Sequence, residues 1–244
     1  MTVVVIGASS GLGRALAARF ARAGDPLVLV SSDRRDLDAH VADFGLNGGA
    51  HAVAVALDLA DRELSLAALD AALDSLPAIS ALLLAAGFSS DDDVPGQDSL
   101  AFENITRINY LSLCRIVEHC LPRLPRAGRA AIIGFGSVAA TRGRSRNVAY
   151  AAAKRALDSY FESLRHSLAA GGVIAQFYVL GYLDTNLSFG RRTLLPKIAP
   201  SRVADIVFRN RERDFGRSYV PWFWRPLCWA VRAVPWFVFR KLSF

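Results

Sequence analysis

Tyr150 and Lys154 stand four residues apart with three alanines between them. At this spacing two side chains share one face of a helix. A tyrosine with an ordinary pKa of ~10 is a poor acid–base group at neutral pH, and a nearby ammonium lowers that pKa by favouring the phenolate. The pair is therefore a candidate for proton transfer. Two further side chains suit this chemistry: the Ser137 hydroxyl to bond a substrate carbonyl, and Asn109 to hold a water that returns a proton to the tyrosine.

A glycine-rich turn, GASSGLG, occupies residues 7–13. Glycine is needed where a backbone turns tightly or approaches a phosphate closely. A helix that begins near Gly11 would offer free N–H groups and the positive end of its dipole to a pyrophosphate. We therefore expect a dinucleotide at this turn. Its candidate contacts are Gly7, Ser9, Ser10, Gly11, Leu12 and Gly13.

Two later segments suit the same ligand. Asp58, followed by Leu59, closes an apolar run, where its carboxylate could accept from an adenine amino group. Asp58 is equally suited to cap a helix that opens near Asp61. The small residues Ala85, Ala86 and Gly87 close another run and leave room for a cofactor across a sheet.

The choice between NAD and NADP depends on the end of the second apolar run. An acidic residue there would bond the ribose diol and repel a 2′-phosphate. Ser31 and Ser32 occupy this place, Asp33 comes one position later, and Arg34 follows. Hydroxyls and a guanidinium tolerate a phosphate, so NADP is favoured and NAD stays open.

Short apolar runs alternate with helical patterns from the first strand onward. The predicted strands are 2–6, 26–31, 51–57, 79–85, 129–136 and 172–179, and the predicted helices are 11–23, 34–44, 61–76, 98–123 and 147–170. Runs without polar alternation are typical of strands buried on both faces. We therefore expect a single α/β domain of the Rossmann type, a doubly wound parallel sheet with helices on both faces. Ligands of such sheets bind at the carboxyl ends of the strands, where these motifs fall.

Over residues 2–185 the sequence resembles the short-chain dehydrogenase/reductase family. The resemblance rests on the glycine turn, Asn109, Ser137, Tyr150, Lys154, Gly181 and Thr185. It implies transfer of a hydride between a nicotinamide and a carbonyl. Tyr150 would donate the proton, Lys154 would hold the ribose, Ser137 would polarise the carbonyl and Asn109 would complete the relay.

Three positions depart from the usual pattern of that family. Ile6 replaces a threonine, Ala85 an asparagine and Leu180 a proline. These changes put the local loop geometry in question, whereas the four catalytic positions are intact. Short-chain reductases often bury their chain ends in oligomers, so the resemblance also favours a homo-oligomer.

A narrower resemblance links residues 142–150 and 234–242 to the decaprenylphosphoryl-keto-pentose reductases. It implies a keto-sugar carried on a polyprenyl phosphate, made by a separate flavin oxidase, in the 2-epimerisation of lipid-linked ribose to arabinose during cell-envelope synthesis. Arg142, Arg144 and Arg146 lie between Ser137 and Tyr150, where they could bind the phosphate or form a solvated loop. A reductase of a fatty, steroid or sphingoid ketone is the alternative, and a catalytically inactive dinucleotide sensor a more distant one.

The C-terminal end is basic and aromatic. Residues 191–244 carry 12 Lys or Arg against 3 Asp or Glu, and residues 221–244 hold eight aromatics, four cations and no acid. No uncharged stretch there approaches the ~20 residues that cross a bilayer. We divide the chain into a catalytic domain at 1–220, with a substrate loop at about 181–200, and an amphipathic tail at 221–244. The tail suits an anionic membrane surface, or alternatively packs on the core or a sister subunit.

Composition places these motifs in an ordinary enzyme. At 244 residues, with 52% hydrophobic and 21% charged residues, the chain suits one globular domain. Three cysteines without metal-ligand spacing indicate reduced thiols and no metal site. The first strand begins at once, without a signal peptide, so we expect a cytoplasmic protein. The inner face of the plasma membrane is the site that the tail would suit. The basic tail has no nucleic-acid recognition motif, and nucleic acid is not an expected partner.

Overall fold

The computed structural model describes residues 1–48, 50–96, 98–125, 130–185, 193 and 195–242. Its centre is a parallel sheet in the order β3-β2-β1-β4-β5-β6-β7. The strands are β1 (Thr2–Ile6), β2 (Leu27–Ser31), β3 (Ala52–Ala56), β4 (Ile79–Leu84), β5 (Ala130–Ser137), β6 (Val173–Leu180) and β7 (Arg217–Val220). The order reverses between β1 and β4, which is where doubly wound sheets bind their ligands. The predicted fold class is confirmed, and the six predicted strands lie within about two residues of the observed ones.

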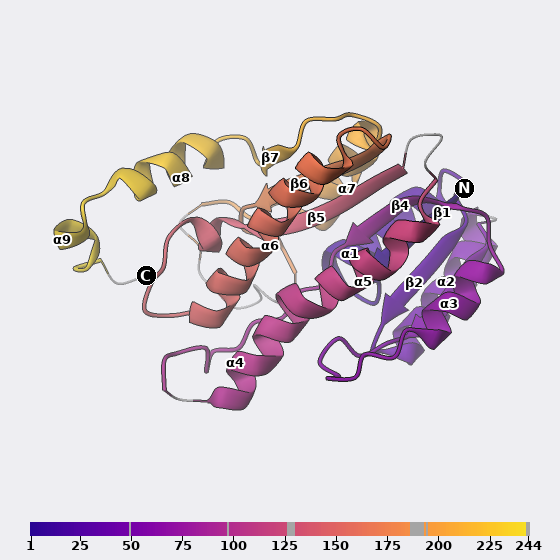
Figure 1. Ribbon diagram of the computed structural model, residues 1–244, viewed down its shortest axis with the longest axis horizontal. Helices are drawn as coiled ribbons and strands as arrows, with labels where there is room; N and C mark the ends of the chain where they lie inside the picture. The colour runs from indigo at the N-terminus through magenta and orange to yellow at the C-terminus, as the bar shows by residue number, and fades with distance from the viewer. Residues whose placement is uncertain (49, 97, 126–129, 186–192, 194, 243–244) are drawn as a thin grey trace.

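Helices cover both faces of the sheet (Figure 1). They are α1 (Gly11–Ala21), α2 (Arg34–Gly48), α3 (Ala67–Asp74), α4 (Ser99–Thr106), α5 (Ser112–Cys120), α6 (Val148–Leu168), α7 (Pro200–Asn210), α8 (Trp224–Ala233) and α9 (Trp236–Phe239). One apolar core joins α1, α2 and α7 to the sheet, and the other joins α3, α5 and α6 to the opposite face. Strands such as β1 and β2 are therefore buried on both sides, as their continuous apolar sequences require.

Two predicted helices differ from the observed ones. The helix expected at 61–76 begins only at Ala67, because Asp58 and Asp61 bond the backbone N–H groups of Ala60 and Glu63 instead. Such local side-chain bonds compete with helix formation. The helix expected at 98–123 is four segments, since a π-helical turn, η1 (Arg107–Leu111), separates α4 from α5, and a 3₁₀ turn, η2 (Leu121–Arg123), follows α5.

β7 and α7 were not predicted from the sequence. β7 has four residues of mixed polarity, and as an edge strand it buries fully only Val220. It therefore lacks the apolar run by which the inner strands are identified. α7 is amphipathic, with Val203, Ala204 and Val207 buried against α1. Its first residue, Pro200, falls at the end of the expected substrate loop at 181–200. Residues 186–192 and 194 of that loop lie outside the described residues.

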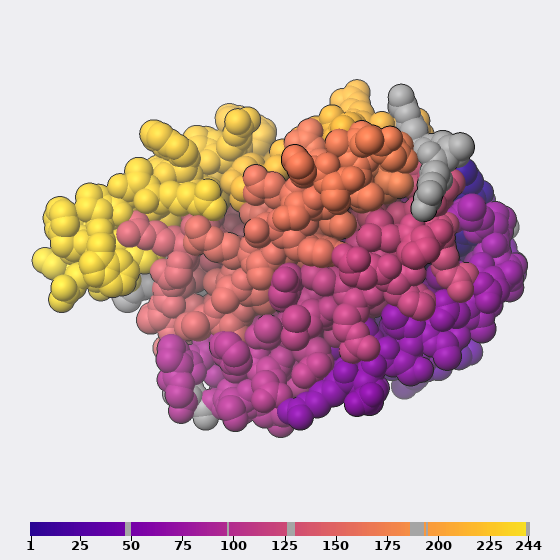
Figure 2. Space-filling view, viewed as in Figure 1, coloured from indigo at the N-terminus to yellow at the C-terminus, as the bar shows by residue number. Residues whose placement is uncertain are grey.

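The C-terminal tail leaves the sheet after β7 and projects from one end of the molecule as α8 and α9, drawn in yellow (Figures 1 and 2). Trp224, Cys228 and Phe239 are buried on its inner side. Most of its other residues are exposed. No helix in the described part of the chain is both long and apolar enough to cross a membrane.

Candidate active site

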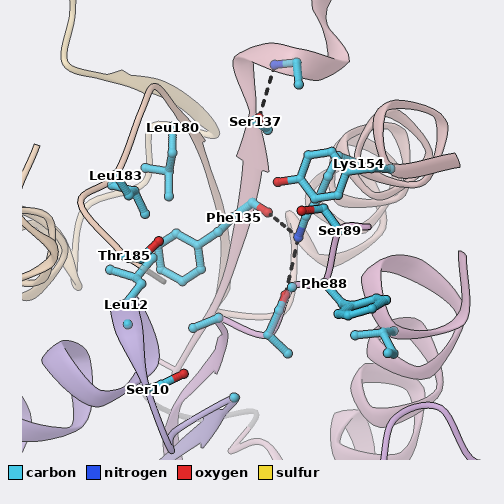
Figure 3. A pocket seen from close by; sticks show the side chains of 18 of the residues that line it. Ser10, Leu12, Phe88, Ser89, Phe135, Ser137, Lys154, Leu180, Leu183 and Thr185 are labelled. Carbon is cyan, nitrogen blue, oxygen red and sulfur yellow. Dashed lines mark hydrogen bonds between the residues drawn. The ribbon is translucent and has the colours of Figure 1, made fainter. Parts of the chain in front are cut away.

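A cavity of about 1190 Å³ opens at the carboxyl ends of the six strands β1 to β6. Most of the predicted cofactor contacts line it, together with three of the four predicted catalytic residues. These are Gly7, Ser9, Ser10, Gly11, Leu12, Ser31, Ser32, Asp58, Leu59, Ala85, Ala86, Gly87, Ser137, Tyr150, Lys154, Gly181 and Thr185. In Figure 3, Leu180, Leu183 and Thr185 form one wall and Phe88 and Ser89 lie opposite, near Lys154. Residues from six strand ends therefore meet in one cavity.

The glycine turn is shaped to receive a phosphate group. Gly7 has a φ of +88° and Gly11 a φ of +52°, a backbone region that favours glycine. A Cβ on Gly13 would lie 1.9 Å from the Gly7 carbonyl oxygen, so α1 packs against the turn only because residue 13 has no side chain. The turn thus brings backbone and the N-terminus of α1 to the cavity. This arrangement fits a dinucleotide pyrophosphate.

Polar groups continue along the same end of the cavity. The Ser31 hydroxyl donates to the Ser9 hydroxyl at 2.9 Å, which joins the end of β2 to the glycine turn. Asp58 lines the cavity and its Oδ1 accepts from the Ala60 N–H. The alternative that Asp58 caps a helix opening near Asp61 is wrong, because that helix begins at Ala67.

Ser137, Tyr150 and Lys154 lie at the other end. Ser137 closes β5, and its hydroxyl accepts the Ala139 N–H that begins the 3₁₀ turn η3 (Val138–Thr141). Tyr150 is in the first turn of α6 and Lys154 one turn later on the same helix. The Lys154 ammonium is buried, and it donates to the carbonyls of Phe135 (3.2 Å) and Ala86 (3.4 Å), as Figure 3 shows. Burial lowers the pKa of Lys154 to about 8.

Asn109 is buried behind the cavity and does not line it. It lies in the π-helical turn η1, where its amide nitrogen donates to the carbonyls of Ile105 and Phe88 and its oxygen accepts the Phe88 N–H. A Cβ built on Gly87 would be 3.4 Å from the Asn109 oxygen and 3.6 Å from the Lys154 nitrogen. Because Gly87 has no side chain, the side chains of Asn109 and Lys154 can both lie close to its backbone. π-Helical turns of this kind are frequent at functional sites.

Three other predicted residues lie outside the cavity lining. Gly13 is behind the turn, where it packs on Gly7. Arg34 pairs with Asp38 on the exposed surface of α2, 2.8 Å away. Arg142 turns to the tail, where it donates to the carbonyls of Val231 and Val234 and stacks on the Phe239 ring. The structure therefore corrects the expectation that Arg34 and Arg142 face the ligand. The guanidinium of Arg34 is paired with Asp38, and that of Arg142 is bonded to backbone carbonyls of the tail.

Cavity residues that the sequence analysis did not single out include Phe88, Tyr182 and Leu183. They follow β4 and β6 directly, so the rule that ligands bind beyond strand ends marks their positions. Their apolar and aromatic side chains have no distinctive chemistry, so the sequence pattern indicates their positions but no role for them.

The family model described as short chain dehydrogenase matches residues 1–193. The chain belongs to the short-chain dehydrogenase/reductase family. It is 29% identical to an uncharacterized oxidoreductase of Mycobacterium tuberculosis over 98% of this chain and 96% of that one. It is 30% identical to a hydroxysteroid 11-beta-dehydrogenase 1-like protein of Xenopus tropicalis over 99% of this chain and 87% of the relative.

Among solved structures, the chain superposes with a TM-score of 0.82 on a short-chain dehydrogenase from Sphingobium yanoikuyae in complex with NADPH. The two are 26% identical, and the match covers 99% of this chain and 96% of the other. This short-chain dehydrogenase/reductase is thus an oxidoreductase dependent on NADP or NAD.

The three departures from the family pattern leave the strand ends in register. Ile6 is fully buried in β1, and its carbonyl accepts the Ala85 N–H at 2.9 Å. Leu180 ends β6, and the Gly181 N–H after it donates to the Val220 carbonyl. Beyond it, the indole of Trp224 occupies the space into which a Gly181 side chain would extend. The tail therefore takes part in shaping the segment after β6.

Proposed function

We propose that this enzyme reduces the keto group of a sugar linked to a polyprenyl phosphate, with Tyr150 as proton donor. The observation that carries the reductase chemistry is the meeting of Ser137, Tyr150 and Lys154 with the glycine turn in one cavity. In this proposal Tyr150 and Lys154 act as the proton-transfer pair and the glycine turn binds the pyrophosphate, at the two ends of a cavity large enough for both ligands.

The bound nicotinamide would supply a hydride to the carbonyl carbon. Ser137 orients the substrate by donating its hydroxyl proton to the carbonyl oxygen, and Tyr150 gives its phenolic proton to that oxygen as negative charge develops. Lys154 holds the ribose hydroxyls and, as an ammonium, favours the phenolate that Tyr150 becomes. Asn109 fixes the backbone of Phe88 beside Lys154, where a bound water could return the proton.

Two arginines favour a phosphate-bearing substrate. Arg144 and Arg146 line the cavity from the loop between Ser137 and Tyr150. The Nε of Arg144 is buried and has no hydrogen-bond partner within the described residues. A buried donor of a charged group is costly unless it is bonded, so an anionic ligand group is its expected partner. Guanidinium groups bind phosphate oxygens with two parallel hydrogen bonds.

NADP is the dinucleotide that the cavity suits better. At the end of β2 the described lining consists of Val30, Ser31 and Ser32. The carboxylate of Asp33 is exposed and accepts the Asp36 N–H, so it is used in the first turn of α2. Hydroxyl groups at this corner are compatible with a 2′-phosphate, which a carboxylate would repel.

The tail suits the surface on which a lipid-linked substrate resides. Trp222, Trp229, Trp236 and Phe237 are between 66% and 78% exposed, and Arg225, Arg232 and Arg240 are exposed among them. Aromatic rings beside arginines favour the headgroup region of an anionic membrane. We therefore propose that the enzyme works in the cytoplasm, at the inner face of the plasma membrane. The resemblance to the decaprenylphosphoryl-keto-pentose reductases supports a flavin oxidase as the source of its keto-sugar, and the family resemblance supports a homo-oligomer.

A lipophilic ketone without phosphate is the second candidate. Apolar side chains of Phe88, Ile108, Leu180 and Leu183 line the cavity. They would accommodate a fatty chain or a steroid, and the name of the Xenopus tropicalis relative refers to a hydroxysteroid. In this alternative Arg144 has no anionic partner.

The test is a comparison of ketones with and without phosphate. Oxidation of the reduced dinucleotide is followed with a polyprenyl-phosphate-linked keto-pentose, the free keto-pentose and a steroid ketone. We expect the first to have the highest kcat/KM, and Arg144→Gln to raise its KM by about 10- to 100-fold while the KM for the steroid ketone stays unchanged. Arg22→Gln, which changes an exposed arginine at the end of α1 outside the cavity lining and outside the tail, is the control. Equal kcat/KM with and without phosphate contradicts the lipid-phosphate substrate.

Tyr150→Phe tests the chemistry independently of the substrate. It should lower kcat by about 10²- to 10⁴-fold with every ketone and leave dinucleotide affinity nearly unchanged, because only the transferable proton is lost. Activity within about tenfold of the wild type would remove Tyr150 from the proposed role.

A further inference from the structure

The helix that carries Tyr150 begins without a cap of its own. Asn147, at the N-cap position of α6, has a left-handed φ of +55° and its side chain makes no capping bond. The first N–H groups of a helix have no partner within the helix and normally bond to such a side chain. At α6 they bond instead to a residue that is remote in the sequence.

That residue is Asp93. Its Oδ1 accepts the Ala149 N–H at 2.8 Å, and its Oδ2 accepts the N–H of Tyr150 itself at 2.9 Å. The Val148 N–H points to the Asp93 carbonyl at 3.5 Å. One residue therefore receives the first three N–H groups of α6. Asp93 is only 4% exposed, and its negative charge lies at the positive end of the helix dipole.

Asp93 belongs to the segment between β4 and α4, which forms part of the cavity wall. At the start of this segment Asn109 holds the backbone of Phe88 by two hydrogen bonds. At Asp93 the same segment is hydrogen-bonded to the N-terminus of α6. The wall from Phe88 to Asp91, which lines the cavity, is therefore fixed at one side to η1 and at the other to the backbone of Tyr150.

We propose that Asp93 is a positioning residue for the reduction, which sets the place of Tyr150 relative to the dinucleotide and the substrate carbonyl. It acts through the backbone of Tyr150 and does not line the cavity. A side chain that transfers a proton must lie within hydrogen-bond distance of the accepting atom, and misplacement by about 1 Å can lower a rate by about 10²-fold. The inference rests on the proposed proton transfer by Tyr150, but not on the proposed lipid-phosphate substrate.

Asp98 provides a matched control. It is the N-cap of α4, where its Oδ1 accepts the N–H groups of Leu100 (2.8 Å) and Ala101 (3.1 Å). Asp93 and Asp98 thus make the same kind of bond to the start of a helix. The helix that Asp98 caps carries none of the proposed catalytic residues, so its loss should affect stability alone.

The experiment compares Asp93→Asn, Asp93→Glu and Asp98→Asn with the wild type, with the water-soluble ketone that the wild type reduces fastest. Asn keeps one acceptor oxygen, and Glu keeps both but moves them by one methylene. We expect both changes at Asp93 to lower kcat by about 10- to 100-fold with dinucleotide affinity within about twofold. The isotope effect on kcat with deuterated reduced dinucleotide should rise, because hydride transfer becomes slower. Asp98→Asn should lower the unfolding temperature and leave kcat and the isotope effect unchanged.

Circular dichroism and dinucleotide titration first establish that each variant is folded. If Asp93→Asn does not fold, Asp93→Glu carries the test. The proposal is overturned if the folded Asp93 variants keep kcat within about twofold of the wild type, or if their isotope effect stays the same. A failure of the lipid-phosphate substrate would leave this result unaffected, since the assay ketone contains no phosphate. A failure of the proton-transfer role would appear separately, as an active Tyr150→Phe.

Discussion

At the scale of single residues, Lys154 combines a charge with full burial. Its ammonium donates to two backbone carbonyls, of Ala86 and Phe135, and burial is the cause of its pKa shift. Desolvation therefore lowers its pKa from 10.5 to about 8. The folded protein binds fewer protons than the unfolded chain between these two values, so the contribution of Lys154 to stability is unfavourable at neutral pH and improves as the pH rises.

Lys154→Met should therefore make the dinucleotide-free protein more stable and less active. Removal of the buried charge should raise the free energy of unfolding at pH 7 by roughly 3 kcal/mol at most, with the gain disappearing toward pH 10.5. Dinucleotide affinity and kcat should both fall. Urea unfolding at several pH values and dinucleotide titration measure these effects, with the exposed neighbour change Arg155→Met as control. Unchanged dinucleotide affinity would remove the ribose contact from the proposed role.

Ser32 decides the choice of dinucleotide in our proposal. Ser32→Asp would place a carboxylate at the end of β2, where a 2′-phosphate has to bind. Repulsion between the two negative groups should shift the preference, measured as the ratio of kcat/KM values, by about 10-fold or more toward NAD. A wild type that already prefers NAD, with a mutant that keeps the same ratio, would show that the proposed NADP preference is wrong.

At the scale of elements, the loop between Ser137 and Tyr150 has two sides. Arg144 and Arg146 line the cavity. Thr141 and Arg142, on the other side, form hydrogen bonds with the tail. The Thr141 hydroxyl donates to the Cys228 sulfur at 3.0 Å, and Arg232 of α8 donates to the Thr141 carbonyl at 3.3 Å. The tail is thus attached to the segment that directly follows Ser137. This attachment explains why Arg142, although close in sequence to the cavity arginines, points elsewhere.

Arg142→Gln should loosen the tail. The substitution removes a charged hydrogen bond to the Val231 carbonyl and the stacking of the guanidinium 3.9 Å above the Phe239 ring. Together these contacts should stabilise the folded protein by roughly 2 kcal/mol. Hydrogen exchange should become faster in residues 224–240 while α1 and β1 keep their protection. Arg225→Gln in α8 serves as control, and equal exchange in both variants would contradict the anchoring role.

At the scale of the whole molecule, the tail projects from one end and adds exposed surface there (Figure 2). Its inner residues Trp224, Cys228 and Phe239 are buried, and its outer aromatics are exposed with arginines between them. Exposed apolar residues of this size are uncommon on a soluble monomer unless they meet a partner. The combination with positive charge favours an anionic membrane over a second apolar surface.

The enzyme should accordingly bind anionic lipid vesicles through the outer face of the tail. Binding should rise with the fraction of anionic lipid, by on the order of 1 kcal/mol for each basic residue near the surface, and weaken with salt. The double change Trp229→Ser and Trp236→Ser should abolish sedimentation with vesicles while kcat for a water-soluble ketone stays unchanged. Leu100→Ser with Phe102→Ser, which removes two exposed apolar side chains of α4, is the matched control. A wild type that ignores anionic vesicles at low salt refutes the membrane contact.

Three features could be predicted from the amino-acid sequence: the order of the inner strands along the chain, the glycine turn and the Tyr150–Lys154 pair. These features depend on local rules: continuous apolar runs for doubly buried strands, glycine for left-handed backbone at Gly7 and Gly11, and a four-residue spacing for one helix face. Even the meeting of these residues could be predicted, since parallel strands bring their carboxyl ends to one edge of the sheet.

The groups that complete the site from distant parts of the sequence depend on how the folded chain packs. Tyr150 bonds through its backbone to Asp93, 57 positions away, and Arg142 to Val234, 92 positions away. The edge strand β7 exists because β6 offers it a partner, although its own four residues have no apolar pattern. An aspartate or arginine side chain can form hydrogen bonds with many different groups. The residue type and its spacing therefore do not specify which group it bonds to in the folded protein. That choice follows from packing, which buries Asp93 at the start of α6 and turns Arg142 toward the tail.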